Sequence, residues 1–112
     1  MDNLSKKYWE KNPTIGSVDQ WTSNPIIAEV VYRRMSGGKS SKHWLSWLLE
    51  DFFKDKKFVR MLSPGCGTGN HEIIVAKTGK VDTIDAFDIS SSSIKIAKDN
   101  TNKEGLVINF YE

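Results

Sequence analysis

A glycine-rich turn constrains the fold of this chain more than any other sequence feature. The segment Gly65-Cys66-Gly67-Thr68-Gly69 follows a short apolar run at 58–62 and precedes a helical pattern at 70–77. A short apolar run closed by a turn signal predicts a buried strand. Glycines between a strand and a helix allow a tight bend and let the backbone approach a ligand closely. The sequence therefore predicts a strand, a ligand-binding turn and a helix in succession.

The remainder of the second half repeats this alternation. Residues 83–87 are predicted to form a strand, 91–100 a helix capped by Ser91 or Ser92, and 106–111 a third strand. Such alternation favours a parallel sheet with right-handed crossovers. We therefore predict an α/β fold class in which residues 58–112 form a βαβαβ unit, a partial Rossmann-like parallel sheet.

Residues 1–57 are predicted to form an N-terminal helical segment that covers this sheet. Asn24-Pro25 is a favourable helix start, because asparagine caps helices well and proline suits the first helical position. Gly37-Gly38 ends that helix, and Ser41 is the expected cap of a second one, which presents a broad apolar face and ends near Lys54.

Composition excludes several classes of protein. The hydrophobic fraction of 38% and the charged fraction of 27% suit a folded globular chain, and 112 residues suit one domain or less. The net charge is +2 without a basic stripe, so we expect no nucleic-acid partner. No apolar run approaches the ~20 residues that cross a bilayer, and no signal peptide is apparent, so we expect a cytoplasmic protein with no membrane partner. No metal site is expected.

Asp88 gives the glycine turn a chemical partner. It lies about 20 residues beyond the turn, at the end of the second predicted strand, where a carboxylate can accept hydrogen bonds from ribose hydroxyls. Asp85 is a rival acid, but strand alternation places it on the opposite face. The alternatives are an ordinary turn at the glycines and a helix N-cap at Asp88.

The segment 59–69 resembles motif I of the class I S-adenosylmethionine-dependent methyltransferases, with its Gly-x-Gly-x-Gly core, and 86–90 resembles the second motif. In the first half, Tyr8-Trp9, Asn24-Pro25, 33–37 and 43–45 are similar to bacterial members that act on small molecules. The resemblance implies S-adenosyl-L-methionine as cofactor. The expected cofactor-binding residues are Ser63, Gly65, Cys66, Gly67, Gly69, Asp88, Ile89 and Arg33. For Arg33 and its neighbour Arg34, the alternative is a solvated basic helix end.

The chain departs from this family in two ways. Ser63 stands where most members have an acid that helps to hold the amino group of the cofactor. The family has a seven-strand domain in which the first three strands lie in the order 3-2-1, whereas this sequence supplies only those three. We therefore expect a fragment of a longer domain, in which strand 58–62 has an unpaired edge and invites a homodimer.

The functional hypothesis is the cofactor-binding portion of a methyltransferase that acts on a small-molecule methyl acceptor, incomplete for catalysis by itself. No catalytic residue is identified, and Cys66 has no general base placed beside it. One alternative is a non-catalytic cofactor-binding or interaction module. A second alternative is an NAD-dependent oxidoreductase, but the dinucleotide pattern requires its third glycine at position 70, which is asparagine.

Overall fold

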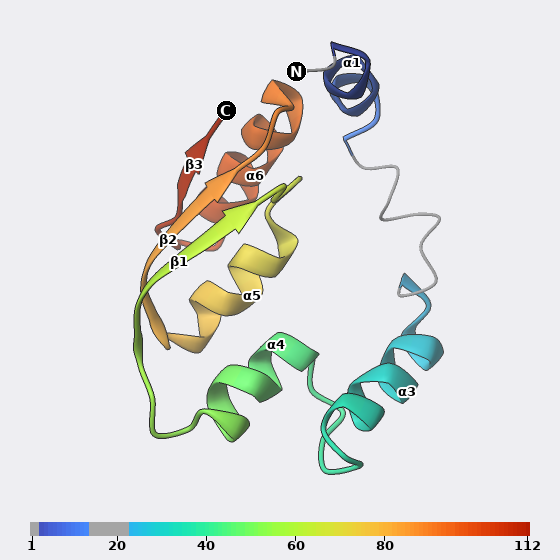
Figure 1. Ribbon diagram of the computed structural model, residues 1–112, viewed down its shortest axis with the longest axis vertical. Coiled ribbons are helices and arrows are strands. Elements are labelled where there is room, and N and C mark those ends of the chain that lie inside the picture. Colours follow the sequence, from blue (N-terminus) through green and yellow to red (C-terminus); the bar gives the residue numbers. More distant parts are fainter. Residues whose placement is uncertain (1–2, 14–22) are drawn as a thin grey trace.

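The computed structural model describes residues 3–13 and 23–112 and shows an α/β arrangement (Figure 1). The elements in chain order are α1 (Asn3–Lys11), α3 (Pro25–Met35), α4 (Trp44–Trp47), the π-helical segment η2 (Leu48–Phe52), β1 (Phe58–Pro64), α5 (Asn70–Thr78), β2 (Val81–Phe87), α6 (Ser91–Lys103) and β3 (Asn109–Tyr111).

The three described strands form one parallel sheet in which β2 is central. β1 pairs with β2 through the register Leu62↔Asp85, and β2 pairs with β3 through Phe87↔Tyr111. The predicted partial Rossmann-like sheet with strand order 3-2-1 is confirmed. Since all three strands run in the same direction, their carboxyl ends meet at one edge, where open α/β sheets bind ligands.

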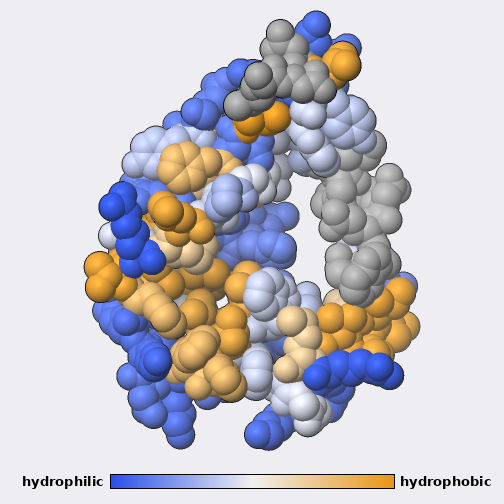
Figure 2. All heavy atoms as spheres, in the orientation of Figure 1, coloured by the Kyte–Doolittle hydropathy of each residue, from blue (hydrophilic) through white to orange (hydrophobic). Residues whose placement is uncertain are grey.

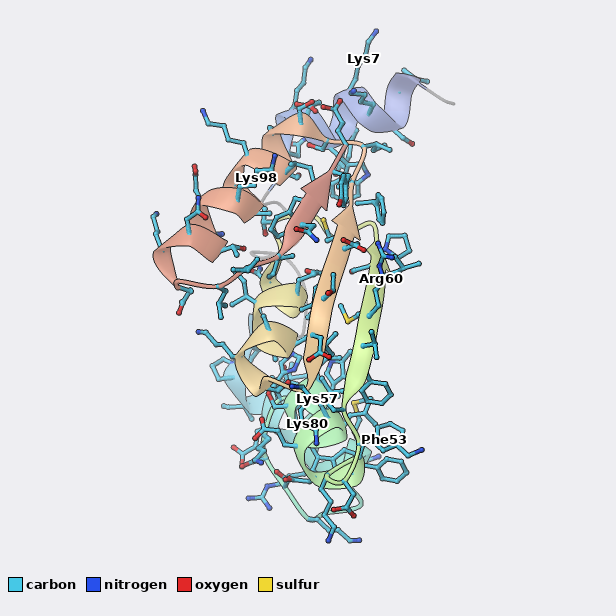
Figure 3. All side chains as sticks on the ribbon, turned by 90° about the vertical axis from the view of Figure 1, so that its left-hand side faces the viewer. Lys7, Phe53, Lys57, Arg60, Lys80 and Lys98 are labelled. Atoms are coloured by element: carbon cyan, nitrogen blue, oxygen red, sulfur yellow. The ribbon has the colours of Figure 1, made fainter. Side chains whose placement is uncertain are left out.

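Helices α5 and α6 cover one face of this sheet (Figure 3), and the hydrophobic core lies between these helices and the strands. One buried cluster joins the α6 residues Ile94 and Ala97 to Ala86 and Phe110 of the sheet. A second cluster joins Val75 of α5 to the sheet and to the α4–η2 segment. Burying a side chain the size of isoleucine or phenylalanine contributes about 1.5–3 kcal/mol, so these contacts fix both helices on the sheet.

Within residues 3–13 and 23–112, no helix covers most of the other face of the sheet, which carries side chains (Figure 3). Asp85 lies there with only 2% of its surface exposed, and it accepts hydrogen bonds from Arg60 at 2.6 Å and from Asn109 at 2.9 Å. These hydrogen bonds, from Asn109 first and then Arg60, lower the pKa of Asp85. Asp85 of β2 therefore links the three strands through its hydrogen bonds to Arg60 of β1 and Asn109 of β3.

Helix α3 begins as the sequence predicts. The side chain of Asn24 accepts hydrogen bonds from the backbone N–H groups of Ile26 at 3.0 Å and Ile27 at 3.4 Å, and Pro25 occupies the first turn. The helix keeps Ile26 75% exposed and Val30 50% exposed. Figure 2 shows this apolar surface over the part of the molecule that α3 occupies.

The second N-terminal helix differs from the expected one in its start and its hydrogen bonding. His43, rather than Ser41, caps it, because the His43 imidazole Nδ1 accepts a hydrogen bond from Leu45 N at 3.2 Å. The expected continuous α-helix gives way to π-helical bonding at η2, and Phe53 N donates to Leu48 O at 2.9 Å. Hydrophobic spacing does not distinguish these two bonding patterns.

In the second half of the chain, the start of α6 and the start of β3 also differ from the predicted boundaries. Ser90, rather than Ser91 or Ser92, caps α6, since its hydroxyl accepts the Ser93 N–H at 3.2 Å. The third strand is shorter than expected: Leu106 N bonds back to Thr101 O at 3.2 Å in the turn that follows α6, and the strand begins only at Asn109. None of the helices described combines the length and apolar character needed to span a bilayer.

Candidate functional site

The glycine turn connects β1 to α5 at the carboxyl edge of the sheet. Gly65, Gly67 and Gly69 adopt positive φ angles of 71°, 56° and 80°. An L side chain in this conformation costs about 1–2 kcal/mol, so the turn depends on glycine. Gly69 caps α5 without a side chain, so the first-turn N–H groups of α5 and the positive end of its dipole face the turn.

Asp88 ties the end of β2 to this turn. One carboxylate oxygen accepts the Gly67 N–H at 2.8 Å, and the other accepts the Ser90 N–H at 2.9 Å. A carboxylate has about four lone-pair positions, so two remain for a ligand. Asp88 is therefore not the N-cap of α6, the alternative considered from the sequence; it binds the N–H of Ser90, which is the cap, and also lies against the glycine turn.

A cavity of about 510 Å³ lies beside Asp88 and the glycine turn. This volume is within the range of about 300–1,000 Å³ that is typical of small-molecule sites. The lining is formed by Trp9, Pro13, Gly65, Gly67, Phe87, Asp88, Ile89, Ser93 and Glu112. The cavity therefore combines apolar and aromatic walls with one carboxylate bound to the turn.

Helix α1 forms part of the cavity wall through Trp9 and is held in place at its C-terminal end. The Glu10 side chain accepts hydrogen bonds from the N–H groups of Ser91 and Ser92, and Ser92 Oγ donates to Glu10 O at 2.9 Å. A carboxylate at a helix N-terminus is stabilised by the free N–H groups and the dipole. Lys6 also forms an ion pair with Glu112. These contacts hold α1 beside α6 (Figure 1).

Of the residues expected at the site, Gly65, Gly67, Asp88 and Ile89 line the cavity. Ser63, Cys66 and Gly69 belong to the same turn region but lie outside the lining. Arg33 lies on α3, where its Nε contacts Glu29 at 3.2 Å, and it does not line the cavity. Its contact with a cofactor stays a prediction.

Sequence reasoning missed five lining residues, and two of them carried a usable signal. Glu112 directly follows the third strand, so the rule that parallel strands share a carboxyl edge places it beside Asp88. The same rule places Phe87, which directly precedes Asp88 at the end of β2, at this edge. Trp9 and Pro13 reach the cavity only through the packing of α1 against α6, for which the sequence gives no signal.

The thiol of Cys66 is unsuited to nucleophilic attack. Burial, and then the negative charges of Glu72 and Asp88, raise the pKa of Cys66 to about 12. The thiolate is the reactive form, and almost none is present at neutral pH. This agrees with the view from the sequence that Cys66 belongs to the turn and is not a catalytic group.

The fold resembles that of two solved structures. One comes from work on the conversion of a disulfide bond into a thioacetal group during echinomycin biosynthesis, with 25% identity and a TM-score of 0.50 over 61% of this chain and 27% of that chain. The other is the cyclase SpnF, with 18% identity and a TM-score of 0.56 over 96% of this chain and 40% of that chain. No protein-family model and no curated protein matches the sequence. The chain thus spans less than half of either matched structure, and the likeness is one of fold.

Proposed function

We propose that this chain is the S-adenosyl-L-methionine-binding portion of a methyltransferase that acts on a small molecule. The observation that carries the proposal is the Asp88 carboxylate, 2.8 Å from Gly67 N at the wall of a cavity of about 510 Å³. The resemblance of 59–69 and 86–90 to the methyltransferase motifs and the likeness in fold to the two solved structures support it.

The residues of the cavity fit the parts of this cofactor. Asp88 retains lone pairs for the two ribose hydroxyls. Trp9, Phe87 and Ile89 provide apolar and aromatic walls that suit a purine ring. The N-terminus of α5 favours the carboxylate of the amino-acid part of the cofactor.

The bound cofactor would supply a methyl group on a sulfonium. The contribution of this chain is to hold that donor in one orientation, because methyl transfer depends largely on the alignment of donor and acceptor. The lining residues of the described cavity are suited to hold the methyl donor, and we assign no acceptor pocket and no general base to this cavity. Binding and catalysis are therefore separate questions for this chain.

Binding is tested by titrating the protein with S-adenosylhomocysteine while following tryptophan fluorescence. We expect saturable binding that Asp88→Ala weakens about 10- to 100-fold, because hydrogen bonds to a charged group are lost. The matched control is Asp82→Asn, since Asp82 also lies on β2 but is exposed and pairs with Lys57 at 3.1 Å. A screen of methyl acceptors then separates an enzyme from a binding module. Saturable NADH binding without S-adenosylhomocysteine binding would instead favour an oxidoreductase.

A further inference from the structure

Glu72 is a buried carboxylate in the first turn of α5. Only 3% of its surface is exposed. Its Oε1 accepts a hydrogen bond from the Ser63 hydroxyl, whereas its Oε2 is buried and has no hydrogen-bond partner among the described residues. A buried carboxylate oxygen without a donor is costly, and such atoms in folded proteins nearly always have a partner. The structure thus contains an acceptor that lacks its donor.

The position of Glu72 relates this acceptor to the glycine turn. Ser63 is half-buried near the end of β1, two residues before Gly65, and Glu72 follows the turn on α5. The negative charge of Glu72 also contributes to the raised pKa of Cys66, after burial, so its field reaches the turn. Glu72 lies in the first turn of α5, where the positive end of the helix dipole is favourable for a nearby negative charge.

We propose that Glu72 supplies the negative charge that holds the ammonium group of S-adenosyl-L-methionine, an inference that rests on the proposed function. Of the charged groups on that molecule, the carboxylate and the sulfonium have no hydrogen to donate, so the ammonium is the group that a carboxylate oxygen recognises. The proposal explains how this chain functions with serine at position 63.

Ser63 transmits this charge to the ligand. Its hydroxyl donates a hydrogen bond to Glu72, so the lone pairs of its oxygen are left to accept a hydrogen bond from another group. The Ser63–Glu72 pair then acts as a carboxylate extended by one hydroxyl. Glu72 is a positioning residue in this scheme, and it acts through Ser63.

The test compares two ligands that differ in the amino-acid part. S-adenosylhomocysteine carries the ammonium, whereas 5′-methylthioadenosine contains the nucleoside and lacks it. We expect Glu72→Gln to weaken S-adenosylhomocysteine about 10- to 100-fold, the effect of losing a charge-assisted hydrogen bond, and to leave 5′-methylthioadenosine unchanged in isothermal titration calorimetry. The double variant Ser63→Asp/Glu72→Gln places an acid directly on β1 and should restore most of the lost affinity.

A purely structural role for Glu72 predicts a different result, namely that both ligands weaken together and Ser63→Asp restores neither. That result, or unchanged binding of both ligands, would overturn the inference while leaving the proposed function intact. If the wild-type chain binds neither ligand, the proposed function falls and the inference with it. Should Glu72→Gln fail to fold by circular dichroism, Ser63→Ala provides the same comparison, with a loss expected for S-adenosylhomocysteine alone.

Discussion

Gly69→Ala tests whether the last glycine of the turn is required for packing as well as for backbone conformation. Gly69 has a φ of 80°, and a Cβ placed there would lie 3.1 Å from the Ala97 side chain and 3.2 Å from Phe110. Both neighbours are buried in the cluster that joins α6 to the sheet. A methyl group at position 69 therefore requires the Ala97 side chain or the Phe110 ring to shift by a few tenths of an ångström.

Two costs add at this position. The left-handed conformation costs about 1–2 kcal/mol for alanine, and overpacking a dense core costs about 1–3 kcal/mol. We therefore expect Gly69→Ala to lower the free energy of unfolding by about 2–5 kcal/mol. Gly79→Ala is the matched control, because Gly79 has a φ of 65° and a Cβ there would meet nothing within 4 Å. It should lose only the conformational part.

The measurement is urea unfolding followed by circular dichroism on the wild type and both variants. With a slope of about 1–3 kcal/mol per molar urea, a difference of 1–3 kcal/mol between the two variants moves the midpoint measurably. Equal midpoints for Gly69→Ala and Gly79→Ala would refute the packing argument, because the two positions share a backbone conformation and differ in their neighbours.

Three further predictions concern reactivity, pH and association. Burial first, and then the charges of Glu72 and Asp88, raise the pKa of Cys66 to about 12, so its alkylation by iodoacetamide at pH 8 should be at least roughly a hundredfold slower in the folded chain than in urea, and equal rates would contradict this. Burial, and then the charge of His71, lower the pKa of His43 in the folded chain, so the unfolded chain binds a proton more readily. The free energy of unfolding should therefore fall as pH drops from 7.5 through 6.5 toward 5. His43→Asn, which retains a capping side chain, should make the urea midpoint less dependent on pH. We also propose that the outer edge of β1, where Val59 is 77% and Leu62 65% exposed, pairs two copies of the chain. The double variant Val59→Lys/Leu62→Lys should then lower the molar mass measured by light scattering toward that of a monomer. A well-folded wild-type monomer at high concentration would refute this pairing.

The sequence was sufficient for the order and type of the elements that build the site. Three glycines between an apolar run and a helical pattern predict a strand, a turn and a helix because few other residues tolerate the required φ angles. Asp88 was identifiable because its spacing places it at the end of the next parallel strand. Such local signals do not depend on how the helices pack.

Boundaries were harder to predict because they depend on competing hydrogen bonds. Ser90, Ser91 and Ser92 are chemically equal as caps, and they differ only through tertiary contacts: Asp88 binds the Ser90 N–H, whereas Glu10 binds those of Ser91 and Ser92. The change from α- to π-helical bonding at η2 likewise leaves the hydrophobic spacing intact. Sequence patterns therefore identified these elements but not their ends.

The sequence by itself determined that the chain has an α/β sheet with a glycine turn and an acid at its carboxyl edge, because spacing along the chain encodes those features. Tertiary structure alone decided which distant side chains complete the site. Trp9 reaches the cavity because Glu10 binds the N-terminus of α6, and Glu72 meets Ser63 because α5 folds back against the sheet. A contact between elements depends on their packing in space, which no local periodicity records.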